Sequence, residues 1–312
     1  MIELSANTIP LRLKTILNLI RIIPVLCWGI SSSLVGLGFA YTSHTKIVWL
    51  DYVLVVLLII LIHGLISHVY NDREDWLSGT DPLSPKLLSG GSKVIARKYC
   101  SLRELTRIGR YTFLPVFVVT LYFFCTRGPS ALFFLAIAIW SALAYSCSPF
   151  RLSYYPLTGE WLCAFPAVLA CTTGTFYALT GTVQEAVIIG GVIHALLAIG
   201  LLMHHHISDI DNDLQALPRK ITTVAWVSLT LGIGTTPVVE LIYFFLALLM
   251  GTVGGLLFHP VLWITVPFSL VCMGVAFLTD PLEIMNITNK EYLLYVLIIG
   301  DAVTKTAILF YQ

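Results

Sequence analysis

Charged residues are scarce in this sequence. Of its 312 residues, 11% are charged and 57% are hydrophobic, and the mean hydropathy is +0.88. So little charge leaves no room for a large water-exposed domain, and a net charge of +1 offers no basic surface to attract nucleic acid. We therefore expect a single domain over residues 1–312 whose partner is the lipid bilayer and not a nucleic acid.

Paired cysteines are lacking as well. The seven cysteines are scattered, mostly inside apolar stretches, and no C-x-x-C pair occurs. This pattern is typical of small core residues, and it disfavours disulfides, zinc ligands and redox chemistry.

Long apolar runs are abundant. A run near 20 residues is long enough to cross about 30 Å of hydrocarbon as a helix. The runs predict an all-α, polytopic membrane protein with nine transmembrane helices. The predicted spans cover residues 22–41, 48–70, 109–126, 130–146, 161–180, 185–206, 235–258, 260–279 and 291–310.

The distribution of cations predicts the orientation. With the amino terminus in the cytoplasm, 15 of the 18 Lys and Arg residues fall inside, and only Lys46, Arg127 and Lys305 fall outside. We expect a protein of the plasma or inner membrane with a cytoplasmic amino terminus and active site. Residues 1–20 carry apolar side chains near helical spacing among cations, which predicts an amphipathic helix on the membrane surface.

One polar connection is unusually long. Residues 71–108 hold several Gly and Pro residues and a stretch, Leu102–Ile108, that could form a short helix. A loop of this length inside a compact domain usually has a function. We interpret residues 71–108 as a cytoplasmic cap over a site.

Two acidic clusters stand at the ends of apolar runs. The first is Asn71-Asp72-Arg73-Glu74-Asp75, with Asp81 behind it, and the second is Asp209-Ile210-Asp211-Asn212-Asp213. If each helix continues through its cluster, Asn71 and Asp75 share one face with His68 nearby, Asp72 is turned about 100° away, and Asp209 pairs with Asp213. Isolated aspartates at span ends are usually only solvated, but two clusters on one side favour a shared site.

The clusters are rich in hard oxygen ligands, for which Mg²⁺ is the natural cation. Such a site could hold a diphosphate and promote its departure, with nearby cations as further donors. An ion-coupled transporter remains an alternative. The nearest cations are Lys93, Arg97, Lys98, Arg219 and Lys220.

The two motifs together resemble those of the UbiA superfamily of intramembrane prenyltransferases. The matching pattern is Asn71-Asp72-x-x-Asp75-x-x-x-Gly79-x-Asp81, followed four spans later by Asp209-x-x-x-Asp213. The Gly79-x-Asp81 extension resembles the MenA-like branch, which prenylates 1,4-dihydroxy-2-naphthoate. The likeness covers about residues 20–310.

The resemblance implies a helical bundle around a central cavity and Mg²⁺-dependent transfer of a polyprenyl group from a polyprenyl diphosphate to a lipophilic aromatic acceptor. Catalysis would fall to Asp72, Asp75, Asp209 and Asp213. Metal would be held by Asn71, Asp75, Asp81, Asp209 and Asp213. Substrate would be bound by Asn71, His68, Lys93, Arg97, Tyr145, His205, Arg219 and Lys220.

One position departs from the superfamily pattern. Related sequences commonly read Asn-Asn-x-Arg before the second motif, whereas this chain reads His205-His206-Ile207-Ser208. The change leaves a UbiA-type terpene cyclase or an ether-lipid prenyltransferase as alternatives. Because consecutive helical residues point about 100° apart, His204, His205 and His206 cannot all face one metal ion. We expect His205 or His206 to contact the diphosphate, and Tyr145 to face the allylic cation.

Overall fold

All regular structure in the described part of the chain is helical. The computed structural model describes residues 11–43, 46–83 and 91–312. A helix pairs its own backbone N–H and C=O groups, as a hydrocarbon environment requires. The α-helices are α1 (Leu11–Ile20), α2 (Ile22–Pro24), α3 (Ser31–Thr42), α4 (Trp49–Ile59), α5 (His68–Ser78), α6 (Thr80–Leu83), α7 (Leu102–Arg127), α8 (Ser130–Ala144), α9 (Phe165–Thr180), α10 (Glu185–Ile207), α11 (Ile210–Gln215), α12 (Thr223–Leu231), α13 (Pro237–Leu257), α14 (Thr265–Phe277) and α15 (Ile284–Phe310).

Shorter helical segments join some of these helices. Three of them are π-helical, with a wider turn than an α-helix. The π-helical segments are η1 (Val25–Ile30), η2 (Ile60–Ser67) and η4 (Glu160–Ala164), and the 3₁₀ segments are η3 (Leu152–Tyr154), η5 (Ile233–Thr235) and η6 (Pro260–Ile264).

Eight continuous helices among the described residues are long and apolar enough to cross a membrane. The ninth predicted span is α8, which has 15 residues and is shorter than the others. The prediction of an all-helical, multi-pass membrane protein is therefore confirmed, and the count of nine is approximately right. The eight are Ile22–Thr42, Trp49–Ser78, Leu102–Arg127, Glu160–Thr180, Glu185–Ile207, Ile233–Leu257, Pro260–Phe277 and Ile284–Phe310.

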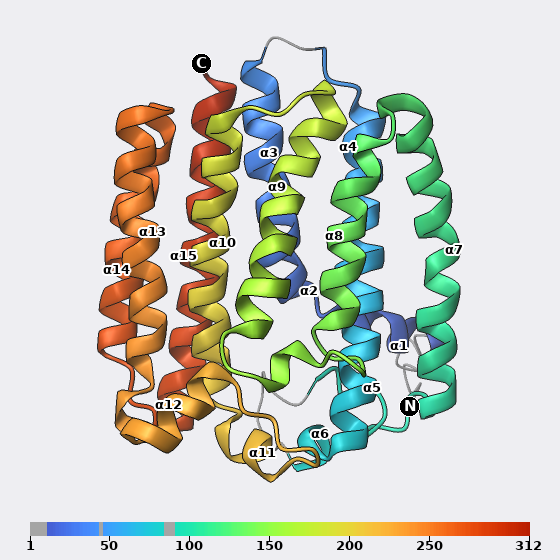
Figure 1. The fold of residues 1–312 in the computed structure, drawn as a ribbon, viewed down its shortest axis with the longest axis vertical. Helices are drawn as coiled ribbons and strands as arrows, with labels where there is room; N and C mark the ends of the chain where they lie inside the picture. The colour runs from blue at the N-terminus through green and yellow to red at the C-terminus, as the bar shows by residue number, and fades with distance from the viewer. Residues whose placement is uncertain (1–10, 44–45, 84–90) are drawn as a thin grey trace, which may run out of the picture.

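The helices stand side by side in one bundle (Figure 1). Helix α7 forms one edge and α13 with α14 forms the other, while α3, α9, α10 and α15 lie between them. Helix α10 packs against α9 and α13, and α3 packs against α9 and α15. Helix α1 and the end of α15 lie at opposite ends of the bundle. Helix α1 exposes Leu11, Leu13 and Leu17 and buries Leu19, which is the pattern of an amphipathic helix.

The second span is longer than predicted, and it takes in part of the expected cap. It runs from Trp49 to Ser78 and ends at Gly79, whose φ of 89° is easily adopted only by glycine. Residues 71–78 are thus its last two turns. Helix α7 also begins earlier than residue 109, because Ser101 and Glu104 form a capping box at its start.

The connection between these helices therefore covers residues 79–101. The predicted short helix Leu102–Ile108 is not separate, since it forms the first turns of α7. Residues 1–10 of the predicted surface helix, and residues 84–90 of the predicted cap, lie outside the described residues.

At the end of the bundle away from α11, a polar latch joins α4, α7 and α9. The Arg127 guanidinium donates to Asp51 Oδ2 at 2.5 Å and to the Ala178 carbonyl at 2.6 Å. The Tyr122 hydroxyl donates to Asp51 Oδ1 at 2.6 Å, and the Tyr177 hydroxyl donates to the Arg127 carbonyl at 2.6 Å. Each charged group in the latch has a partner, so the charges at this end of the bundle compensate each other.

Glycine allows the central helices to approach closely. A Cβ atom added at Gly36 on α3 would collide with the Thr172 carbonyl oxygen on α9. Small residues at helix contacts are a common means of packing in membranes, where burial from water does not drive association. The contact between α3 and α9 thus depends on the missing side chain of Gly36.

Replacement of this glycine tests that dependence. We expect G36A to lower the free energy of unfolding by about 1–3 kcal/mol, because backbone cannot move aside as a side chain can. G274A is the control, since nothing lies within 4 Å of a Cβ atom built there. Thermal unfolding in detergent compares the two, and a G36A protein as stable as G274A would contradict the packing argument.

Candidate functional site

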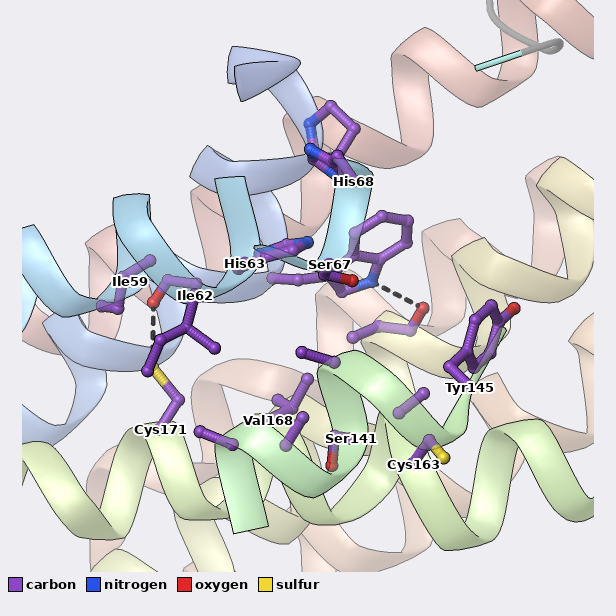
Figure 2. A pocket seen from close by; sticks show the side chains of 18 of the residues that line it. Ile59, Ile62, His63, Ser67, His68, Ser141, Tyr145, Cys163, Val168 and Cys171 are labelled. Carbon is purple, nitrogen blue, oxygen red and sulfur yellow. Dashed lines mark hydrogen bonds between the residues drawn. The ribbon is translucent and has the colours of Figure 1, made fainter. Parts of the chain in front are cut away.

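An elongated cavity with a volume of about 320 Å³ lies inside the bundle. At one end it is lined by polar residues of the two acidic clusters, and farther in by apolar side chains such as Ile62 and Val168 (Figure 2). Its lining extends along the second span from Asp75 back to Val55. At 1.5 Å per helical residue, these 20 positions correspond to about 30 Å, comparable to the hydrocarbon thickness of a bilayer.

Each of the three π-helical segments contributes to the cavity wall. Trp28 and Gly29 of η1, His63 of η2 and Cys163 of η4 all line it. A π-helical turn carries an extra residue and displaces its neighbours, and such turns are frequent at functional sites. These segments displace backbone where the cavity runs between the helices.

The first acidic cluster forms as the sequence predicts. Asn71 donates from Nδ2 to Asp75 Oδ2 at 3.0 Å, one helical turn away, and to the Ser146 hydroxyl at 3.0 Å. Asn71 and Asp75 both line the cavity. The other oxygen of Asp75, Oδ1, is buried without a hydrogen-bond partner.

Asp72 faces away from the cavity, toward the segment that follows residue 90. Its Oδ2 accepts hydrogen bonds from the Ser92 backbone N–H at 3.1 Å and from the Ser92 hydroxyl. A Cβ atom on Gly91 would lie 2.6 Å from both Asp72 Oδ1 and Asp81 Oδ2, so only glycine fits between these carboxylates. Asp72 therefore holds this segment in place, whereas Asp81 lines the cavity.

The second acidic cluster follows a break in the helix. Helix α10 ends at Ile207, and Asp209 is the residue that precedes the short helix α11. Asp209 lines the cavity, with Oδ1 buried and unpartnered. Asp213 is fully buried, and neither of its carboxylate oxygens forms a hydrogen bond.

Lys220 joins the two clusters. Its Nζ lies 3.5 Å from Asp75 Oδ2 and 3.5 Å from Asp213 Oδ1. The chain turns back after α11, where the Lys220 backbone N–H donates to the Asp213 carbonyl at 3.0 Å. The neighbouring cation, Arg219, is exposed and donates to the Leu214 carbonyl at 3.1 Å, so the structure does not bring it into the cavity.

A second, smaller cavity of about 240 Å³ adjoins the first. Lys93 and Arg97 line it, and neither lines the main cavity. Arg21, which directly follows the predicted surface helix and was not predicted as a site residue, lines both cavities. Its left-handed backbone, with φ 47°, turns the chain between α1 and α2. The signal in the sequence that could have identified Arg21 as a site residue is its position as a lone cation at the start of an apolar run.

The three consecutive histidines point to different partners, as their helical positions require. His204 bonds to Glu240, His205 faces Glu291 and Asp209, and His206 Nε2 lies 3.4 Å from the Tyr145 hydroxyl. Of these three histidines, His205 and His206 line the cavity, as does Tyr145. These separate contacts agree with the expectation that the three histidines do not face one metal ion.

His68, the other histidine expected at the site, touches the cavity while holding α1 in place. Its Nδ1 lies 2.9 Å from the Leu19 carbonyl and 3.2 Å from the Gly64 carbonyl. The contact with Leu19 joins the amphipathic helix to the second span, a partnership that sequence spacing could not indicate.

The carboxylates outside the spans are electrostatically crowded. Burial and the like charges of Asp209 and Asp75 raise the pKa of Asp213 to about 7, although the nearby Lys220 ammonium lowers it. Burial and the charges of Asp75 and Asp72 raise the pKa of Asp81 to about 9. For Lys220 burial disfavours the charged amine, but Asp213 and Asp75 outweigh it and raise its pKa well above the usual value. A further cation would relieve the repulsion that Lys220 only partly offsets.

The donor set fits a hard divalent cation. Both clusters offer carboxylate oxygens that are buried without hydrogen bonds. The described residues contain no group of three His, Cys, Asp or Glu side chains that could hold a metal ion by themselves. The unpartnered carboxylate oxygens suit Mg²⁺, which is commonly held by one or two carboxylates together with water and phosphate oxygens. The residues that would hold it are Asn71, Asp75, Asp81, Asp209 and Asp213.

The fold is similar to solved structures of UbiA proteins. A UbiA homolog from Archaeoglobus fulgidus bound to GPP and Mg²⁺ is 13% identical with a TM-score of 0.67, over 94% of this chain and 99% of that chain. A structure of a UbiA homolog from the same organism bound to DMAPP and Mg²⁺ is 13% identical with a TM-score of 0.65, over 93% and 99%.

A digeranylgeranylglyceryl phosphate synthase is 15% identical with a TM-score of 0.60, over 96% of this chain and 99% of that chain. No protein-family model matches the sequence, and no curated protein matches it. These structural likenesses establish that the chain adopts the UbiA fold over nearly its whole length.

The crowding of carboxylates predicts how stability depends on pH. An unfolded Asp titrates near 3.9, whereas folded Asp213 titrates at about 7, so between these pH values the folded chain holds a proton that the unfolded chain has lost. Without divalent cations, stability should therefore fall as pH rises through this window, and Asp81 should extend the fall toward pH 9.

Thermal unfolding from pH 5 to 9 with a chelator measures this slope. D213N should flatten its lower part, up to about pH 7. D211N, on the exposed side of the same short helix, serves as the control. If stability depends on pH in D213N as it does in the unmodified protein, ionisation of Asp213 does not destabilise the fold.

Proposed function

We propose that this protein is an Mg²⁺-dependent membrane prenyltransferase. It would transfer a polyprenyl group from an isoprenyl diphosphate to an aromatic acceptor. The observation that carries the proposal is the form of the cavity, in which two acidic clusters and Lys220 stand at the mouth of a long apolar space inside a UbiA fold. An isoprenyl diphosphate has the matching form, a polyanion attached to a hydrocarbon chain.

The residues at the polar end would bind the diphosphate. Asn71, Asp75, Asp209 and Asp213 would hold Mg²⁺ with Asp81 beside them. When bound, Mg²⁺ supplies positive charge that stabilises the departing diphosphate. The Lys220 ammonium, aligned between Asp75 and Asp213, is a donor already fixed in place for phosphate oxygens.

The apolar length of the cavity would hold the prenyl chain and exclude water from the allylic carbon. Its wall is formed by aliphatic and aromatic side chains of α4, η2, α7, α8 and α9. Tyr145 lies near the polar end, where its ring can face a developing carbocation. The lining includes Val55, Leu58, Ile59, Ile62, Phe123, Phe134, Leu135, Ala138 and Val168.

For the acceptor we propose 1,4-dihydroxy-2-naphthoate or a similar quinone precursor, as in menaquinone-type biosynthesis. The support is the resemblance of the Gly79-x-Asp81 extension to the MenA-like branch. Asp81 lies where such an extension can act, since it lines the cavity beside Gly91. We further propose that the acidic end faces the cytoplasm, as the cation distribution predicts.

Turnover of a defined donor tests the proposal. Purified protein is incubated with Mg²⁺ and labelled geranylgeranyl diphosphate, with and without 1,4-dihydroxy-2-naphthoate, and both diphosphate release and lipid products are measured by mass spectrometry. We expect release that depends on the acceptor and gives a prenylated naphthoquinol. D75N and D209N should lower this turnover at least ~100-fold, as expected for loss of a metal ligand, while remaining folded in detergent.

Other outcomes of this assay would indicate a different function. Release without acceptor, with a cyclic product, would indicate a terpene cyclase. Transfer only to a glycerol phosphate acceptor would indicate an ether-lipid enzyme. No release with any donor length would contradict prenyl transfer and favour an ion-coupled transporter.

Two adjacent cations offer a matched test of the diphosphate site. K220Q removes the ammonium between the acidic clusters, and we expect turnover to fall about 10²- to 10³-fold, the usual cost of losing one fixed donor. R219Q alters a side chain that points out of the cavity and should have a far smaller effect. Equal effects of the two substitutions would contradict the role of Lys220.

A further inference from the structure

Two adjacent histidines on α10 each pair with a glutamate from another span. His204 Nδ1 lies 2.8 Å from Glu240 Oε2, and His205 Nδ1 lies 2.8 Å from Glu291 Oε1. Glu240 belongs to α13 and Glu291 to α15, and both are buried. The two pairs share their chemistry, but their surroundings differ.

The first pair is self-contained. The second ring nitrogen of His204, Nε2, lies 2.9 Å from the Ile287 carbonyl, so both nitrogens have partners outside the cavity. His204 is fully buried and does not line the cavity. This pair joins α10, α13 and α15, which is a structural role.

The second pair reaches the acidic cluster. His205 Nε2 lies 3.6 Å from Asp209 Oδ2, one turn further along the chain, while Nδ1 is held by Glu291. His205 and Asp209 both line the cavity. Glu291, His205 and Asp209 thus form a row that leads from the last span to the mouth of the cavity.

Asp209 has few other restraints. It follows the break between α10 and α11, and its side chain gives no cap to α11. Its Oδ1 is buried without a hydrogen bond, and its Oδ2 lies 3.6 Å from His205 Nε2.

We propose that Glu291 is a positioning residue for the cation site. It fixes the ring of His205, and His205 in turn fixes the Asp209 carboxylate in the orientation that receives a divalent cation. This inference rests on the proposed function, because it requires that Asp209 is a cation ligand. Partners that orient a ligand in this way commonly change metal affinity by 10- to 100-fold.

The row also gives a physical role to the departure from the superfamily pattern. With His205 in place, the side chain before the second motif spans the distance between a glutamate of α15 and Asp209. An asparagine at this position is too short to reach both. The histidine and Glu291 therefore act as one unit in this chain.

Binding of Mn²⁺, followed by electron paramagnetic resonance with Mg²⁺ as competitor, tests the proposal without relying on turnover. We expect E291Q to weaken Mn²⁺ binding about 10-fold or more. E240Q is the matched control, since it alters the same kind of pair, formed by the neighbouring histidine of α10 away from the cavity. Its Mn²⁺ affinity should stay that of the unmodified protein. Thermal unfolding checks that both variants are folded.

Two substitutions of His205 sharpen the result. The amide of Gln reaches about as far as Nε2 and can still contact Asp209, whereas the amide of Asn reaches only as far as Nδ1. H205N should therefore lose as much affinity as E291Q, and H205Q should lose less. Should one of E291Q and H205N fail to fold, the other still tests positioning, with E240Q as the control for E291Q and H205Q as the control for H205N.

D209N separates failure of this inference from failure of the proposed function. If D209N binds Mn²⁺ as well as the unmodified protein does, Asp209 is not a ligand and the cation site itself is misassigned. If D209N weakens binding but E291Q does not, or if E291Q and E240Q weaken it equally, only the positioning role of Glu291 is overturned.

Discussion

A buried lysine between two groups of carboxylates is the interaction on which the site depends. Asp75 and Asp213 come from parts of the chain separated by four spans, and they would repel each other if nothing stood between them. Lys220 Nζ lies 3.5 Å from each of them. Its charge compensates only part of the negative charge, and burial together with the charges of Asp209 and Asp75 keeps the pKa of Asp213 raised. The site is therefore folded but electrostatically incomplete, a state suited to a ligand that brings cations and phosphate together.

The helices around this site pack closely in some places and leave a cavity in others. Close packing needs small residues, and Gly36 lets α3 lie against the backbone of α9. A cavity needs space between helices, and the π-helical turns of η1, η2 and η4 displace backbone along the cavity wall. Tight contacts at the centre of the bundle thus occur in the same helices whose wider turns line the cavity.

Much of this arrangement could be predicted from the sequence. Apolar runs gave the multi-pass helical class, and the spacing of Asn71 and Asp75 gave their shared face. The sequence located the Asp209 cluster but not the helix break that separates it from α10. The apolar pattern ends at this point whether the helix continues or breaks, so it could not show the break. Arg219 and Lys220 looked equivalent, since only the backbone bond from Lys220 to Asp213 decides which one turns inward.

Contacts between side chains of distant spans could not be predicted from the sequence either. The ring of His68 bonds to the Leu19 carbonyl, and Glu291 bonds to His205, across 49 and 86 residues of chain. A single apolar span that contains one acid does not reveal which other span it faces. Periodicity identifies the face of a helix, but the partner of that face comes only from the packing of the whole bundle.

The polar latch of Asp51, Arg127 and Tyr122 has a consequence for what can move through the protein. The apolar lining extends to Val55 and Phe123, next to the latch. The cavity is thus lined by charged residues at one end, and the ion pair of the latch lies next to the other end of its lining. A bare ion that travelled down it would lose its hydration along an apolar wall, at an idealised cost of order 20 kcal/mol. Hydrocarbon would meet no such cost, so the apolar wall suits a hydrocarbon chain better than a bare ion.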